Sequence, residues 1–181
     1  MTETPETVLD FWYNELTPKQ WFVKDPEIDR KITERFASLH LALSRQVPAE
    51  WRASPDARLA LVVVLDQFSR NMYRGSPLAF ATDTLALKAA KAAIAVGADM
   101  AVSEERRVFF YTPFEHAENL DDQARAVSLF KALGDETYLD YAIQHEDVIK
   151  QFGRFPHRNS ILGRTSTPAE EAYLAEPGAG F

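Results

Sequence analysis

The chain has 181 residues, of which 46% are hydrophobic and 26% are charged, as in an ordinary globular protein. A formal net charge of −7 and a pI of about 5.1 argue against binding to nucleic acid or to an anionic membrane surface. The sequence has no cysteine, which excludes disulfide bonds, thiol catalysis and cysteine metal sites. We therefore predict a single domain over residues 1–181.

The start of the chain does not look like an export signal. Its first residues, MTETPETVLDFWYNEL, are acidic where a signal peptide is basic. The longest apolar run, Leu59–Leu65, is far shorter than the roughly 20 residues that span a bilayer. We expect a cytoplasmic protein that does not contact the membrane.

Helix starts are marked by a capping residue followed by proline. The side-chain oxygen of the first accepts a free backbone N–H, and proline fits the first helical position because its missing N–H is not needed there. The pattern occurs at Thr4-Pro5, Asp25-Pro26, Ser54-Pro55, Ser76-Pro77 and Thr167-Pro168.

The first half of the chain predicts four main helices, over Pro5–Leu16, Pro26–Arg45, Pro55–Gln67 and Pro77–Val96. The third contains Leu59–Leu65, which is apolar all round. A buried strand would have the same composition, but no partner strand is visible, so a central helix is favoured. We expect the core to include Phe11, Trp12, Ile32, Phe36 and Leu61.

The second half predicts a helix from Glu104 to Tyr111 that Pro113 kinks or stops. Three further helices follow, over Leu120–Leu133, Glu136–Phe152 and Pro168–Ala175. The predicted fold class is all-α, built from antiparallel helical hairpins.

The loop after Phe152 carries a concentration of basic residues, because positions 153–166 contain three arginines and no acidic residue. Residues 98–147, which precede it, hold twelve acidic residues against four basic ones. The arginines either form surface ion pairs with these neighbours or converge on an anionic ligand. The candidate ligand-binding residues in this loop are Arg154, Arg158 and Asn159.

A second aromatic-Arg-Asn segment, Asp66–Asn71, echoes the loop and precedes a turn closed by Gly75. It adds Arg70, Asn71 and Arg74 to the candidate ligand-binding residues. Both segments adjoin a helix end, so the alternative is that they cap helices. If they bind a ligand, we expect them to face one cleft.

Histidine placement adds the possibility of acid–base chemistry. Periodicity places His145 on the inward face of its helix, with Tyr138, Tyr141, Ile149 and Phe152. An inward histidine needs a partner, which Glu118 or a tyrosine hydroxyl would supply. The candidate acid–base residues are His116, Glu118, His145 and His157, and the alternative is a hydrogen-bonded core histidine.

Patterns for metals and common cofactors are missing from the sequence. It contains no HExxH pair, P-loop, dinucleotide glycine pattern or Gly-x-Ser-x-Gly elbow. We therefore predict no bound metal and no cofactor.

Five stretches of the sequence resemble the bacterial family catalogued as domain of unknown function 924 (DUF924). They are Val8–Trp12, Asp66–Asn71, Phe80–Asp83, His116–Glu118 and Gly153–Asn159. The resemblance implies an all-helical fold similar to tetratricopeptide-repeat proteins, and it implies no activity. The sequence departs from the family at Ser69, where proline is usual, and at Ala117, where serine is usual.

Two functional hypotheses follow. In the first, an Arg- and His-lined cleft binds a small anionic metabolite and a histidine transfers protons. In the second, a tetratricopeptide-like surface holds an acidic peptide or the C-terminus of another protein without chemistry. The sequence leaves the oligomeric state open.

Overall fold

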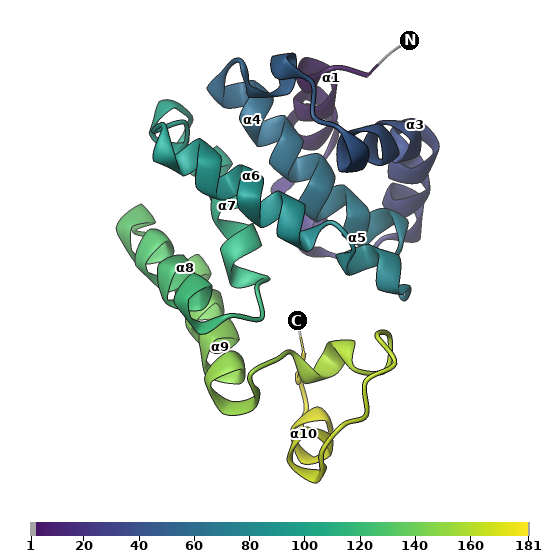
Figure 1. Cartoon of the computed structure of the whole chain (residues 1–181), viewed down its shortest axis with the longest axis vertical. Coiled ribbons are helices and arrows are strands. Elements are labelled where there is room, and N and C mark those ends of the chain that lie inside the picture. Colours follow the sequence, from purple (N-terminus) through teal and green to yellow (C-terminus); the bar gives the residue numbers. More distant parts are fainter. Residues whose placement is uncertain (1–2, 181) are drawn as a thin grey trace. The chain divides into compact units, whose positions relative to one another are not determined.

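A computed structural model describes residues 3–180, shown in Figure 1, and within this range every regular element is a helix. The predicted all-α class is confirmed. The described residues up to Arg74, with Leu78–Pro113, form a first compact unit, and Gly75–Pro77 with the residues from Phe114 onward form a second. The expectation of a single domain stays a prediction. None of the helices described is both long enough and apolar enough to cross a membrane.

The first unit contains α-, π- and 3-10 helices in close succession. The sequence-predicted caps explain three of the starts, because Thr4, Asp25 and Ser54 each accept a backbone N–H of the helix that follows. In chain order the elements are α1 (Pro5–Asp10), η1 (Phe11–Glu15), α2 (Pro18–Phe22), α3 (Pro26–Arg45), η2 (Ala49–Arg52), α4 (Pro55–Val62), η3 (Val63–Phe68), α5 (Ser69–Met72), η4 (Pro77–Phe80), α6 (Asp83–Ala95), η5 (Asp99–Ala101) and α7 (Glu104–Glu115). Pro77 of η4 and the last two residues of α7, Phe114 and Glu115, belong to the second unit.

The core of the first unit surrounds α4 and η3, as the apolar run predicted. Residues Leu59–Leu65 are buried throughout and helical, which confirms the choice of a helix over a strand. Phe68 of η3 and Phe36 of α3 are also buried in this core, with their ring centres 4.7 Å apart. The five predicted core residues, Phe11, Trp12, Ile32, Phe36 and Leu61, are all buried.

Two predicted boundaries in this unit are wrong. The central helix does not end near Gln67, because η3 and α5 continue it to Met72. The helix expected to begin at Pro77 is split into η4 and α6, and its α-helical part begins only at Asp83. The cause is tertiary, since the Thr82 hydroxyl in the intervening turn donates to the Leu65 carbonyl at 2.6 Å.

Of the two outcomes predicted for Pro113, a kink or an end of the helix, the end is wrong, because α7 runs through Pro113 to Glu115. Proline has no N–H with which to bond the Phe109 carbonyl four residues earlier. The Thr112 hydroxyl lies 3.4 Å from that carbonyl, but its one hydrogen is better placed for the Asp66 carboxylate at 3.1 Å.

The second unit is built on the hairpin of α8 (Leu120–Leu133) and α9 (Glu136–Phe152), followed by η6 (Pro156–Arg158) and α10 (Pro168–Leu174). Glycines in the left-handed conformation end both hairpin helices, Gly134 at φ +85° and Gly153 at φ +70°. Thr167 caps α10 as predicted. Phe155 is fully buried in a small core with Val148 and Ile149.

Candidate functional site

Arg70 is held between two carboxylates of the first unit. It donates to Asp66 at 3.0 Å and to both oxygens of Asp83 at 3.0 and 3.1 Å. Asp66 is completely buried and also accepts from Gln67 and from the Thr112 hydroxyl. The predicted ligand-binding arginine is therefore part of a hydrogen-bonded network inside the unit.

Asn71 and Arg74 share a third carboxylate, that of Asp29. The Asn71 amide donates to it at 2.8 Å, and Arg74 forms a two-pronged pair with it at 2.7 and 2.8 Å. These bonds engage Asn71 and Arg74 within the first unit, which supports a structural role for the segment over ligand binding. The sequence predicts that this segment lies near the basic loop. The two segments belong to separate units, so their closeness stays a prediction.

In the second unit, two arginines of the basic loop also pair with internal carboxylates. Arg154 donates to both oxygens of Glu170, at 2.6 and 2.8 Å, and the buried Glu170 carboxylate is the N3 member of the α10 capping box. The Arg154 fork thereby fixes the loop to the start of α10. Its hydrogen bond lowers the pKa of Glu170 to about 2.

Glu118 anchors the other end of the loop. Its two oxygens accept from Arg164 at 2.7 and 2.9 Å, and one of them also accepts the Phe155 N–H at 2.8 Å. Burial would raise the pKa of Glu118, but these hydrogen bonds outweigh burial and lower it. Arg164 also donates to the Asn159 amide oxygen at 2.9 Å, so Asn159 belongs to the same anchor.

Three of the four histidines of the protein lie in the second unit, two of them against Phe155 and the third beside His145. The Phe155 ring lies 5.6 Å from that of His145 and 5.5 Å from that of His157, and the His116 ring lies 6.4 Å from that of His145. Arg158 completes this group. Its guanidinium stacks 4.6 Å from the Phe155 ring centre, and it donates to the His116 carbonyl at 3.0 Å.

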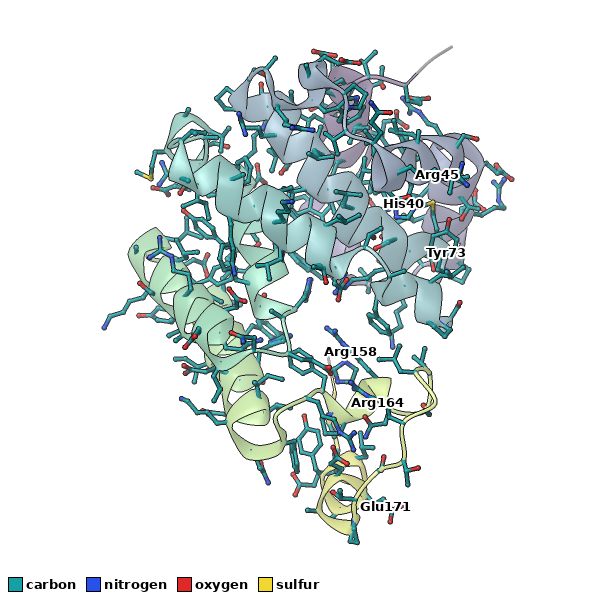
Figure 2. All side chains as sticks on the ribbon, in the orientation of Figure 1. His40, Arg45, Tyr73, Arg158, Arg164 and Glu171 are labelled. Carbon is teal, nitrogen blue, oxygen red and sulfur yellow. The ribbon has the colours of Figure 1, made fainter. Side chains whose placement is uncertain are left out.

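We call His116, His145, His157 and Arg158 the histidine cluster. Figure 2 labels Arg158 and Arg164, which both come from the segment that follows α9. Arg158 is only 6% exposed, and its permanent positive charge lies among imidazoles. The fourth histidine, His40, belongs to the first unit, where it is buried and bonds the Thr82 hydroxyl at 3.2 Å.

His145 is buried, as predicted, but Tyr141, which was expected on the same inward face, is 52% exposed, and the partners of His145 differ from those expected. Its Nδ1 lies 2.8 Å from the Tyr141 carbonyl and 3.2 Å from a Glu115 carboxylate oxygen. A carbonyl oxygen only accepts, so Nδ1 carries the hydrogen and Nε2 is the basic nitrogen. Glu118, the partner expected from the sequence, is engaged by Arg164 instead, and Tyr141 contributes its backbone while its side chain is half-exposed.

Glu115 is the residue that sequence reasoning missed. The helix was expected only to about Tyr111, whereas α7 continues past Pro113 and Glu115 lies beside His145 from its last turn.

The environment keeps two of the imidazoles neutral. Burial lowers the pKa of His145 to about 3, nearby His116, His157 and Arg158 lower it further, and the bond to Tyr141 acts in the opposite direction. Burial and the adjacent Arg158 lower the pKa of His157 to about 4. Both side chains are therefore neutral near neutral pH.

Residues 3–180 contain no group of three or more His, Asp or Glu side chains arranged to hold a metal ion. The first unit has an open hollow of about 560 Å³, which is lined by residues outside the predicted site, among them Pro5, Asp10, Asn14, Ser54 and Arg106. Its only lining arginine, Arg106, pairs with Asp56 at 3.0 Å.

Comparison with known proteins gives a family and a structural relative. The family model described as bacterial protein of unknown function (DUF924) matches residues 8–178. A solved structure of a protein of unknown function from Agrobacterium tumefaciens is 44% identical, with a TM-score of 0.91 over 96% of this chain and 97% of that one. No match was found among curated proteins. The chain therefore belongs to the DUF924 family of bacterial proteins.

Proposed function

We propose that the second unit binds a small anionic metabolite at the histidine cluster, and that His145 accepts a proton there. The observation that carries the proposal is the packing of His145, His157 and the buried Arg158 around the Phe155 ring, with the His116 ring 6.4 Å from that of His145. A core histidine needs only one hydrogen-bond partner, so the structural alternative does not account for three together.

The charge balance of the cluster favours an anion. Arg158 is always protonated, and its positive charge contributes to the low pKa of His145 and His157. An anion bound beside Arg158 would offset this charge and favour the protonated imidazoles. Binding would then be coupled to proton uptake by the cluster.

The geometry of His145 suits a general base better than a simple ligand contact. Its Nδ1 hydrogen is held by the Tyr141 carbonyl, and the Glu115 carboxylate beside it would stabilise the imidazolium formed when Nε2 takes a proton. A carboxylate behind an imidazole is the usual arrangement for orienting a catalytic histidine.

The other predicted ligand residues take supporting roles in this proposal. Arg154, Asn159 and Glu118 shape the loop that carries His157 and Arg158, through the Glu170 and Arg164 ion pairs. Arg70, Asn71 and Arg74 stabilise the first unit. Since these arginines are paired with internal carboxylates, the alternative of an acidic peptide held by several arginines is less well supported.

The finer fold description implied by the family resemblance is also part of the proposal. We propose that α8 and α9 correspond to one hairpin of a tetratricopeptide-like array, because they are antiparallel neighbours joined by a short glycine turn. This hairpin delivers His145 to the cluster.

A thermal-shift series tests the function. Sulfate and a panel of anionic carboxylates and phosphate esters are added to the parent protein and to Arg158→Lys, His157→Gln and His40→Gln. A ligand of the native state raises the melting temperature by mass action. We expect the shift to be lost in His157→Gln, reduced in Arg158→Lys and kept in the His40→Gln control. Anion-induced shifts that persist equally in all three variants would refute the site.

A further inference from the structure

The segment Glu176–Gly180, which follows α10, lies against the histidine cluster. A Cβ atom built on Gly180 would lie 2.9 Å from Cβ, 3.3 Å from Cγ and 3.6 Å from Nδ1 of His157. Contacts below 3.0 Å are not tolerated by a real Cβ, so the Gly180 backbone touches this imidazole side chain directly. The segment therefore covers one side of His157.

The segment is bonded to α10 and within itself. The Gly180 N–H donates to the Tyr173 hydroxyl at 3.3 Å, and the Ala179 N–H bonds the Glu176 carbonyl at 3.2 Å. Tyr173 in turn packs on Phe152 at the end of α9, with ring centres 5.2 Å apart. Glu176–Gly178 are exposed, and exposed segments open locally at low cost in free energy.

We infer that Glu176–Gly180 is a strap that controls access to His157, closed in this structure and lifted when an anion enters the cluster. The inference rests on the proposed function for the identity of the ligand, but not for the existence of the strap. The Tyr173 hydroxyl is the latch, because it joins the strap to α10 and, through its ring, to α9.

Glycine substitutions provide a matched test on the full-length protein. Gly178 and Gly180 both have left-handed backbones, with φ of +81° and +85°, so alanine strains the two positions alike. A Cβ at Gly178 meets no atom within 4 Å, whereas a Cβ at Gly180 collides with His157. Only Gly180→Ala should lift the strap.

Access is measured by the rate at which diethyl pyrocarbonate modifies His157 at neutral pH, located by mass spectrometry. We expect Gly180→Ala to react about tenfold faster than the parent, which corresponds to about 1.4 kcal/mol in the closing equilibrium. Gly178→Ala should react like the parent. Tyr173→Phe, which keeps the ring and removes the latch hydroxyl, should react faster than the parent without changing the segment's glycines.

Sulfate affinity, measured on the same variants, separates the strap from the proposed function. Faster His157 modification with tighter sulfate binding in Gly180→Ala supports both. Faster modification without sulfate binding in any variant supports the strap and rejects the anion site. Modification of His157 that is unchanged in Gly180→Ala and Tyr173→Phe, or equally accelerated in Gly178→Ala, overturns the strap.

Discussion

The two Arg-Asn pairs of the protein, Arg70-Asn71 and Arg158-Asn159, look alike in sequence and differ in their partners. Arg70 donates to the carboxylates of Asp66 and Asp83, and Asn71 donates to Asp29. Arg158 donates to a backbone carbonyl and stacks on Phe155 among three imidazoles. Asn159 bonds Ser166 and Arg164.

The role of each arginine therefore depends on partners that are distant in sequence. A guanidinium beside two carboxylates is compensated and serves stability. The Arg158 guanidinium depresses the pKa of His145 and of His157, and it also lowers the pKa of Glu118. The first arrangement is a structural network, and the second is our candidate site.

The largest expected effect is in the first region. Asp66→Ala removes a completely buried carboxylate that accepts from Arg70, Gln67 and Thr112, and it should lower the free energy of unfolding by about 3 to 5 kcal/mol. Asp56→Ala is the control, because the Asp56–Arg106 pair is exposed and should contribute about 0 to 1 kcal/mol. Equal losses in urea denaturation would show that the Asp66 network is not structural.

In the second region, stability should depend on pH in a window set by the histidines. His145 and His157 have folded-state pKa values of about 3 and about 4, below the ordinary 6.5, so the unfolded protein binds more protons between these values. The free energy of unfolding should therefore rise with pH up to about 6.5 and fall as the solution is acidified.

Glu118 and Glu170 affect the free energy of unfolding only at lower pH, because their pKa values in the folded protein are lowered from 4.5. Near pH 5 we expect a slope of about 1.4 kcal/mol per pH unit for each histidine, which falls to about half of that at pH 6.5. His145→Gln should reduce the slope. A slope that is unaffected by this change would mean that His145 is not a buried neutral imidazole.

The loop anchor should have a smaller effect. Glu118→Gln keeps the shape of the side chain but removes the charge that pairs with Arg164, and it should cost about 1.5 to 3 kcal/mol. Glu146→Gln is the control, since the Glu146–Lys150 pair has a half-exposed lysine and should contribute less than about 1 kcal/mol. Similar losses in thermal denaturation would contradict the anchoring role.

Sequence reasoning predicted what is local. The bounds of α3, α8 and α9 followed from caps and apolar periodicity, and the burial of His145 followed from its helix face. The split before α6 accompanies a hydrogen bond from the Thr82 hydroxyl to the Leu65 carbonyl, which sequence periodicity does not encode. Glu115 was missed as the partner of His145 because α7 continues past Pro113.

The same distinction explains the arginines. That Arg70, Arg74, Arg154 and Arg164 have acidic partners at 13 to 46 positions' distance is a tertiary fact. The distribution of charges along the sequence left two alternatives open, internal ion pairs or convergence of the arginines on an anionic ligand.

The smallest predicted effect is the loss of a single helix N-cap, and it should be similar in the two units. Ser54 and Thr167 each accept a backbone N–H at the start of a helix, so Ser54→Ala and Thr167→Ala should each cost about 1 kcal/mol. An unchanged denaturation midpoint in either variant would reject that cap.

The histidine cluster should respond to an anion, and the Arg70 network should not. The most direct measurement is a sulfate titration at about pH 6 that follows the imidazole ring resonances of all four histidines by NMR. Sulfate is chosen because its charge does not change near this pH. We predict that His116, His145 and His157 shift together toward the protonated form while His40, in the first unit, does not. No response from the three, or an equal response from His40, would contradict the account.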